Sequence, residues 1–194
     1  AKYSMIAAED GGIIDDLITY RFEEDKFLVV PNAGNADTVW DELNKRAEGF
    51  DVSLKNESRD VAMIAVQGPK AAEILVPLVE DNKQDEVFNL GYYAATMGKV
   101  ARTFAIIART GYTGEDGFEL IVYNSDAPQL WEELLKAGAE YDLKPCGLAA
   151  RDSLRLEAGM PLYGNELSRD ITPVEAGMAL SLIHISEPTR QAEI

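Results

Sequence analysis

Short β-type segments joined by tight turns recur along this chain, and they constrain its fold more than any other feature. The segments Ile13–Phe22 and Lys26–Val30 are rich in β-branched and aromatic residues and flank a polar turn, which is typical of a β-hairpin. A second hairpin turn is expected at Gly98-Lys99. The further strand candidates, in chain order, are Val61–Val66, Gly91–Met97, Val100–Arg109 and Phe118–Tyr123.

Segments with helical spacing alternate irregularly with these strands. They are Ala36–Gly49, Lys70–Val79, Ala127–Tyr141 and Leu148–Ala158, and a charged loop is expected at Asp81–Glu86. A doubly wound sheet needs regular strand–helix alternation, whereas hairpins are frequent here. The pattern therefore predicts the α+β class, with mixed or antiparallel sheets and packed helices.

The acidic balance of the chain excludes several classes of function. Thirty-four Asp and Glu residues against 18 Lys and Arg residues give a formal net charge of −16, which disfavours nucleic acid and anionic membrane surfaces as partners. The apolar runs are also too short to span a bilayer. The only cysteine, Cys146, fits a reducing compartment.

The only histidine of the chain is His184, near the C-terminus. With so few His and Cys residues we expect no metal site, no Cys–His pair and no Ser–His–Asp triad. Chemistry must then come from carboxylates, arginines, tyrosines, backbone amides or a borrowed cofactor. The segment Leu180–Arg190, LSLIHISEPTR, resembles a translated sequencing-library adapter, which would also remove His184; the alternative is a strand followed by a polar tail.

A pair of adjacent aspartates, Asp15 and Asp16, lies within the first strand pattern, after Gly11-Gly12. Neighbouring residues on a strand point to opposite faces, so one of the two carboxylates is expected to point inward. An inward carboxylate is costly unless it is paired, hydrogen-bonded or facing a cavity. Taken alone, the pair is more simply explained by an aspartate that caps a turn.

A glycine-rich segment, RTGYTGEDGFE, runs from Arg109 to Glu119. It lacks the Gly-Lys-Ser/Thr of a phosphate-binding loop, and a strand rather than a helix follows it. The simple explanation is a hairpin connection. The alternative is a ligand site, because the glycines let backbone approach a ligand closely and a carboxylate accepts paired hydrogen bonds from an N–H/NH2 edge such as that of a pterin.

Two arginines four residues apart, Arg151 and Arg155, lie on one face of the last helical segment. They are expected either to pair with Asp152 and other acidic groups in solvent or to meet a ligand anion.

The aspartate pair, the glycine-rich segment and the helical segment with the two arginines follow one another along the chain, and the segments Tyr163–Leu167 and Thr172–Gly177 come after them. Together these motifs resemble the aminomethyltransferase (T-protein) family of the glycine cleavage system. The resemblance runs up to about Ala179 and implies the folate-binding aminomethyltransferase-like fold. It also implies tetrahydrofolate as co-substrate and the lipoylated H-protein as partner. The implied reaction moves the methylene of the aminomethyl-dihydrolipoyl arm to tetrahydrofolate and releases ammonia. The implied location is the bacterial cytoplasm, or the mitochondrial matrix in a eukaryote.

The resemblance assigns roles to individual residues. Asp16 matches the important aspartate, expected either to stabilise positive charge as the amine leaves or to orient the folate, while Asp15 faces the other way and matters less. Asn32 is assigned to the same pocket, although Pro31 stands where a smaller residue is expected. The remaining folate-site positions are Tyr20, Tyr112, Glu119 and Arg151, with Glu119 on the pterin edge.

The domain organisation follows from the same resemblance. We expect part of a first folate-binding domain at 1–60, a ferredoxin-like α+β subdomain at 61–145, a return helix and loop at 146–179, and the adapter at 180–194. The resemblance implies proteins about twice this length, with an N-terminal segment and a C-terminal β-rich domain that this sequence lacks. The fragment is then expected to bind folate weakly or not to fold alone, and to be inactive by truncation.

Two other functions remain open from the sequence. One is a non-catalytic folate-binding relative of the same fold, of the iron–sulfur maintenance type. The other is the folate domain of a dimethylglycine or sarcosine dehydrogenase. The intact Asp15-Asp16 pair together with the full glycine-rich segment favours the transferase.

Overall fold

The computed structural model describes residues 1–178, so the adapter-like segment and His184 lie outside the described residues. The chain forms two compact units. Unit 1 combines Ala1–Lys55 with the chain from Pro161 onward, and unit 2 spans Asn56–Met160. The return to unit 1 thus begins at Pro161, later than the expected position 146.

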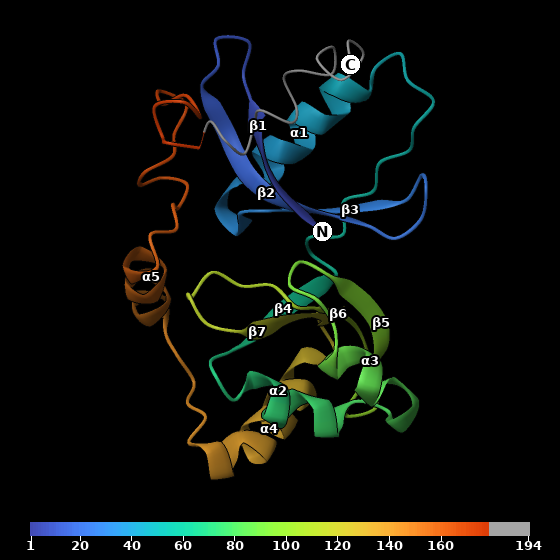
Figure 1. The fold of residues 1–194 in the computed structure, drawn as a ribbon. Coiled ribbons are helices and arrows are strands. Elements are labelled where there is room, and N and C mark those ends of the chain that lie inside the picture. Colours follow the sequence, from blue (N-terminus) through green and yellow to red (C-terminus); the bar gives the residue numbers. More distant parts are fainter. Residues whose placement is uncertain (179–194) are drawn as a thin grey trace, which may run out of the picture. The chain divides into compact units, whose positions relative to one another are not determined.

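Unit 1 is built on a three-stranded antiparallel sheet in the order β1-β2-β3 (Figure 1). The hairpin expected from the sequence is present as β2 and β3, which pair from Leu17↔Pro31 to Arg21↔Phe27. The helix α1 packs on this sheet through a core of Ile6, Ile14, Leu17 and Val39. The elements are β1 (Lys2–Ala7), β2 (Ile13–Arg21), β3 (Phe27–Pro31), η1 (Ala33–Asn35) and α1 (Ala36–Ala47).

The returning segment of unit 1 lies against the start of β2. The backbone N–H of Ile13 lies 3.1 Å from the carbonyl oxygens of both Ser168 and Ile171. A Cβ at Gly12 would lie 1.9 Å from the carbonyl oxygen of Arg169, so this close approach requires glycine. The hydroxyl of Tyr163 also donates to the Ile13 carbonyl, at 3.2 Å. Gly12 and the segment Tyr163–Leu167 therefore have structural roles within unit 1.

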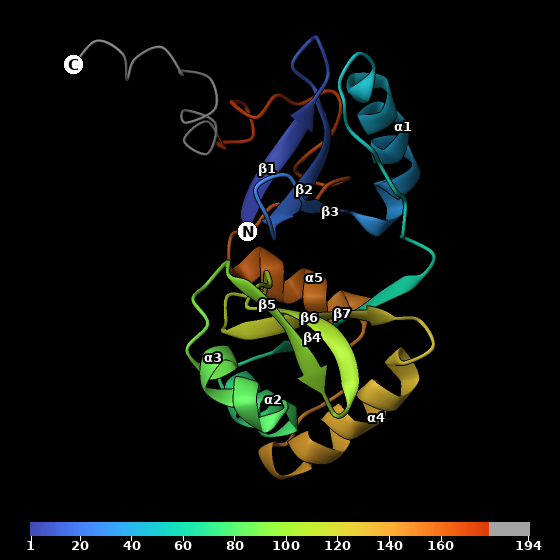
Figure 2. The same cartoon turned by 90° about the vertical axis from the view of Figure 1, so that its right-hand side faces the viewer.

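Unit 2 contains a four-stranded antiparallel sheet in the order β4-β7-β6-β5, which confirms the α+β class. The short helix α2 contacts β4 and β7, the longer α4 contacts β4 and α2, and the two helices cover one face of the sheet (Figure 2). The strands are β4 (Val61–Gln67), β5 (Ala95–Val100), β6 (Thr103–Ala108) and β7 (Gly117–Tyr123). The helices are α2 (Ala71–Leu75), η2 (Val76–Leu78), η3 (Asp81–Lys83), α3 (Gln84–Phe88), α4 (Ala127–Gly138), η4 (Ala139–Tyr141) and α5 (Leu148–Glu157).

The order of elements in unit 2 differs from the expected ferredoxin-like arrangement. That motif places a helix between its third and fourth strands. Here β6 and β7 are adjacent antiparallel strands joined by the loop 109–116. This direct connection puts the glycine-rich segment at one end of the sheet.

The second hairpin turn lies three residues later than expected. Gly98 is inside β5 and pairs with Ala105, while the turn is formed by Ala101 and Arg102. Both turn residues have positive φ, 47° and 72°, as a two-residue hairpin turn with a right-handed twist requires. The expected charged loop at 81–86 is instead η3 followed by the start of α3.

The core of unit 2 lies between the sheet and its helices. Alternate residues of β4 and β7 point into it, and the amphipathic α4 contributes two leucines. Its most buried members include Leu75, Val87, Ile107, Phe118, Leu120 and Leu130. Within residues 1–178, no helix has the length and apolar character needed to cross a membrane.

Candidate functional site

The aspartate pair of unit 1 is joined to the residue that follows β3. The side-chain amide nitrogen of Asn32 lies 2.9 Å from Asp15 Oδ1 and 2.8 Å from Asp16 Oδ1. The backbone N–H of Asn32 donates to Asp15 Oδ2 at 3.0 Å. The antiparallel pairing of β2 with β3 places Asn32 beside both carboxylates, so the structure brings Asn32 and Asp16 together as a contact.

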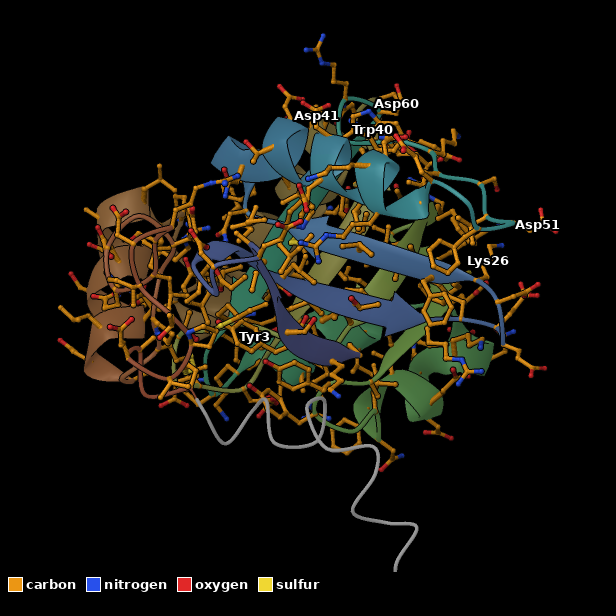
Figure 3. All side chains as sticks on the ribbon, turned by 90° about the horizontal axis from the view of Figure 1, so that it is seen from above. Tyr3, Lys26, Trp40, Asp41, Asp51 and Asp60 are labelled. Atoms are coloured by element: carbon orange, nitrogen blue, oxygen red, sulfur yellow. The ribbon has the colours of Figure 1, made fainter. Side chains whose placement is uncertain are left out.

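Asp16 has a second partner on β1. The hydroxyl of Tyr3, labelled in Figure 3, donates to Asp16 Oδ2 at 3.0 Å. Asp16 pairs with Met5, so Tyr3 is a diagonal neighbour on the same face of the sheet. Burial raises the pKa of Asp16, with a smaller contribution from Asp15, while the bonds from Tyr3 and Asn32 oppose the rise. A carboxylate with a raised pKa and fixed donors is suited to acid–base or electrostatic work.

Asp15 is the carboxylate that points into unit 1. Its residue is fully buried, whereas Asp16 is half-buried. Both of its carboxylate oxygens accept hydrogen bonds from Asn32, which satisfies the buried charge. Tyr20 shares the strand face of Asp16, is 2% exposed and stacks against Phe22 with ring centroids 6.5 Å apart.

The carboxylate of Glu119 on β7 forms the centre of the candidate site in unit 2. The hydroxyl of the buried Thr110 donates to Glu119 Oε2. Burial raises the pKa of Glu119, and the Thr110 bond and the charge of Arg151 oppose the rise. Glu119 is thus a half-buried acceptor with one oxygen already bonded.

Tyr112 and Arg151, both expected at the folate site, contact each other in unit 2. The guanidinium carbon of Arg151 lies 5.2 Å from the centre of the Tyr112 ring. Arg155 differs from its neighbour on the helix because it is 3% exposed and bonded to Asp152 at 2.8 and 2.7 Å. Of the two arginines, Arg151 is the exposed one with a cationic group beside Glu119 and Tyr112.

Arg109 has a structural role rather than a ligand-binding one. Its guanidinium makes two bonds to the Asp116 carboxylate, at 2.9 and 2.7 Å, and donates to the carbonyls of Phe88 and Leu90. It also stacks over Phe118, 5.2 Å from the ring centre. These contacts close the base of the loop and lower the pKa of Asp116.

The expected site residues therefore fall into two groups. Asp16, Tyr20 and Asn32 belong to unit 1, and Tyr112, Glu119 and Arg151 belong to unit 2. Sequence reasoning missed Tyr3 and Thr110, which bond to the two carboxylates. The only signal for Tyr3 would have been the β1–β2 register, and Thr110 carried none beyond its place next to Arg109.

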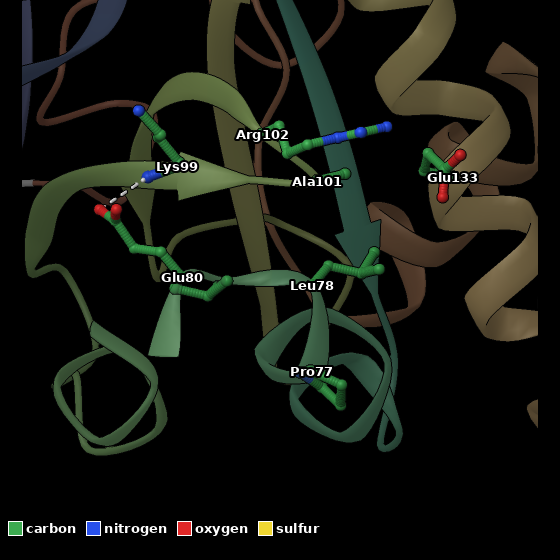
Figure 4. A pocket seen from close by; sticks show the side chains of 8 residues that line it. Pro77, Leu78, Glu80, Lys99, Ala101, Arg102 and Glu133 are labelled. Atoms are coloured by element: carbon green, nitrogen blue, oxygen red, sulfur yellow. Dashed lines mark hydrogen bonds between the residues drawn. The ribbon is translucent and has the colours of Figure 1, made fainter. Parts of the chain in front are cut away.

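A cavity of about 300 Å³ in unit 2 (Figure 4) has none of these residues in its lining. It is lined by Pro77, Leu78, Val79, Glu80, Lys99, Ala101, Arg102 and Glu133. The lining holds two cationic residues, Lys99 and Arg102, and two acidic ones, Glu80 and Glu133, and the backbone N–H of Lys99 donates to the Glu80 carboxylate at 3.2 Å. The cavity therefore has no single-sign charge that would select a ligand. Residues 1–178 contain no group of three His, Cys, Asp or Glu side chains placed to hold a metal ion.

Comparison with known proteins identifies a matching family model and several similar proteins. The family model described as GCVT N-terminal domain matches residues 1–183. A protein of Corynebacterium aurimucosum named aminomethyltransferase is 86% identical over 179 residues, which cover 92% of this chain and 48% of that protein. The aminomethyltransferase of Corynebacterium jeikeium is 54% identical over 192 residues, which cover 93% of this chain and 49% of that protein. The chain spans about half the length of the curated relatives it matches.

Solved structures show the same relationship. The crystal structure of the glycine cleavage system aminomethyltransferase T from Bartonella henselae superimposes with a TM-score of 0.80 at 37% identity, over 98% of this chain and 48% of that one. A heterotetrameric sarcosine oxidase from Corynebacterium sp. U-96 gives a TM-score of 0.50 at 18% identity, over 75% of this chain and 68% of that one. The second likeness concerns the fold alone.

Proposed function

The chain belongs to the aminomethyltransferase family, through its GCVT N-terminal domain, and on that premise we propose that the protein carrying it is the aminomethyltransferase of glycine cleavage. In the proposed reaction the methylene of an aminomethyl-dihydrolipoyl arm on H-protein passes to tetrahydrofolate. Ammonia and the dihydrolipoyl arm are released. We expect the protein to work in the bacterial cytoplasm, since the relatives named above are bacterial.

The observation that carries this proposal is the arrangement around Asp16. One-carbon transfer to a nitrogen needs positioning and charge control, and needs no histidine. The Asp16 carboxylate is held between the Tyr3 hydroxyl and the Asn32 amide, so its direction is fixed before a substrate arrives. A fixed carboxylate stabilises the positive charge that develops as the amine departs, or orients the folate that accepts the carbon.

Each unit, taken by itself, holds residues proposed to contact the folate: Tyr20 and Asn32 in unit 1, and the Glu119 group in unit 2. When bound, tetrahydrofolate supplies the nitrogen that accepts the one-carbon unit. Glu119 suits a pterin edge because a half-buried carboxylate accepts two adjacent N–H donors strongly. Tyr112 offers an aromatic face, and Arg151 offers a cation beside it.

The proposal is tested by ammonia release in the intact protein. Purified protein is mixed with aminomethylated H-protein, and ammonia is measured with and without tetrahydrofolate. We expect release that depends on both. Tetrahydrofolate binding without ammonia release would favour the non-catalytic folate-binding relative, and the absence of both would reject the proposed function.

A further inference from the structure

The side chain of Gln67 fills the inside of the glycine-rich loop in unit 2. Gln67 is the last residue of β4 and pairs with Gly117, the first residue of β7. Its amide nitrogen lies 3.0 Å from the carbonyl oxygen of Thr110 and 3.3 Å from that of Phe118. Its amide oxygen accepts a hydrogen bond from the Thr113 hydroxyl at 3.2 Å. One side chain therefore bonds to the loop at Thr110 and Thr113 and to the start of β7 at Phe118.

Two glycines of the segment 109–119, Gly111 and Gly117, leave the space that the Gln67 amide occupies. A Cβ at Gly111 would lie 2.0 Å from the amide oxygen of Gln67, and a Cβ at Gly117 would lie 2.4 Å from its amide carbon. Real Cβ atoms do not approach other atoms so closely. The sequence left open a hairpin connection or a close backbone approach to a ligand, and at Gly111 and Gly117 the nearest side-chain atoms belong to Gln67.

The backbone next to Gln67 strengthens the same attachment. Gly68 has a φ of +126°, a value that favours glycine, and its N–H donates to the Asp116 carbonyl at 2.8 Å. The Arg109–Asp116 pair described above closes the loop from outside. Gln67 bonds to the loop from its inner side, through the carbonyl of the buried Thr110.

We propose that Gln67 is a positioning residue for the folate site, acting through Thr110 on Glu119 and through the loop on Tyr112. Thr110 connects Gln67 with Glu119, because its carbonyl oxygen accepts a hydrogen bond from the Gln67 amide while its hydroxyl donates one to the Glu119 carboxylate. Fixing the Thr110 backbone fixes the direction of the Glu119 carboxylate before a ligand binds. This inference rests on the proposed function for its ligand, although its structural part is independent of any ligand.

The first experiment replaces the amide and keeps the shape. Gln67→Met in the intact protein preserves the length of the side chain between the two glycines but donates no hydrogen bond. The matched control is Gln84→Met, because the Gln84 amide also donates to a backbone carbonyl, that of Val79, at 2.9 Å in the same unit. We measure the KM for tetrahydrofolate, kcat at saturating tetrahydrofolate, and the melting temperature.

For Gln67→Met we expect the KM for tetrahydrofolate to rise by about tenfold or more, with kcat changed by less than about twofold. Gln84→Met should leave both constants near those of the wild type. A merely structural role would lower the melting temperature and the active fraction, so that apparent kcat falls while KM stays unchanged. That pattern, or wild-type constants in Gln67→Met, would overturn the proposal.

A double-mutant cycle tests the close contact itself. Gly117→Ala alone should weaken tetrahydrofolate binding, because the new Cβ displaces the Gln67 amide. In a Gln67→Ala background the same Cβ enters vacated space, so Gly117→Ala should cost little more. Strictly additive effects on tetrahydrofolate affinity would show that the two residues act independently and would contradict the proposal.

Hydrogen exchange separates this inference from the proposed function. Backbone amides at 110–117 should exchange faster in Gln67→Met than in the wild type or in Gln84→Met, with no ligand present. If the wild type binds no tetrahydrofolate but the loop still exchanges faster in Gln67→Met, the proposed function fails and the loop attachment stands. If the wild type binds tetrahydrofolate and exchange at 110–117 is unchanged, the positioning role fails alone.

Discussion

Asn32 donates both its backbone N–H and its side-chain amide to the two carboxylate oxygens of Asp15, at 3.0 and 2.9 Å. This two-point contact fixes the end of β3 against the middle of β2. It also directs the same amide toward Asp16, so a buried structural aspartate sets the geometry of its half-buried neighbour. The two aspartates should therefore respond differently to the same substitution.

Asp16→Asn should abolish methylene transfer and leave tetrahydrofolate affinity within a few-fold of the wild type. The substitution keeps the shape of the side chain and removes the negative charge proposed to stabilise the positive charge that develops as the amine leaves. Ammonia release from aminomethylated H-protein reports the transfer step, and calorimetry reports the affinity. Full transfer activity in Asp16→Asn would show that the pair is structural and that the proposed role of Asp16 is wrong.

Asp15→Asn should instead lower the free energy of unfolding, by about 1–3 kcal/mol, with a smaller effect on transfer than Asp16→Asn. One carboxylate oxygen becomes an NH2 group that faces a donor of Asn32. Urea unfolding gives the stability, and Asp25→Asn in the exposed turn after β2 is the matched control. A dead Asp15→Asn protein with normal stability, beside an active Asp16→Asn protein, would mean that the two roles are exchanged.

Glu119→Ala should weaken tetrahydrofolate binding by about 2–3 kcal/mol, since a charge-assisted pair of hydrogen bonds is lost. The control is Glu115→Ala, an exposed carboxylate of the same loop. Calorimetry with tetrahydrofolate makes the comparison directly. Equal affinity in the wild type and Glu119→Ala would remove Glu119 from the site.

Glu119 should also make stability depend on pH in a specific direction. Burial raises the pKa of Glu119 in the folded state. At pH values between the unfolded and the folded pKa, the folded protein therefore still carries the proton that the unfolded chain has released. Stability from this group is therefore lost as the pH rises from the ordinary carboxyl range, about 4, through the raised pKa. Glu119→Gln should be more stable than the wild type at neutral pH, and this advantage should disappear in acid. Urea unfolding at several pH values checks it, and a difference that does not vary with pH would contradict the raised pKa.

Local patterns in the sequence were sufficient for most elements of the fold. The β2–β3 hairpin, the helix α1 and the helix α4 follow from apolar periodicity and from turn residues, because these signals act over a few neighbouring positions. The α+β class followed from their order. Of the residues that the motifs assign to a folate site, Asp16 contacts Asn32 in unit 1 and Tyr112 contacts Arg151 in unit 2, whereas their roles toward a ligand stay predictions.

Only the tertiary structure decided which of those residues are buried and what each of them contacts. Which aspartate is buried depends on the side of β2 that receives α1, and Tyr3 reaches Asp16 through the register of β1. The turn at Ala101-Arg102 lacks the glycine that usually marks such a turn. The glycines at 111 and 117 admit Gln67, which lies more than forty positions before them in the chain. Contacts between residues so far apart leave no periodic signal, because packing and pairing rather than local propensity select them.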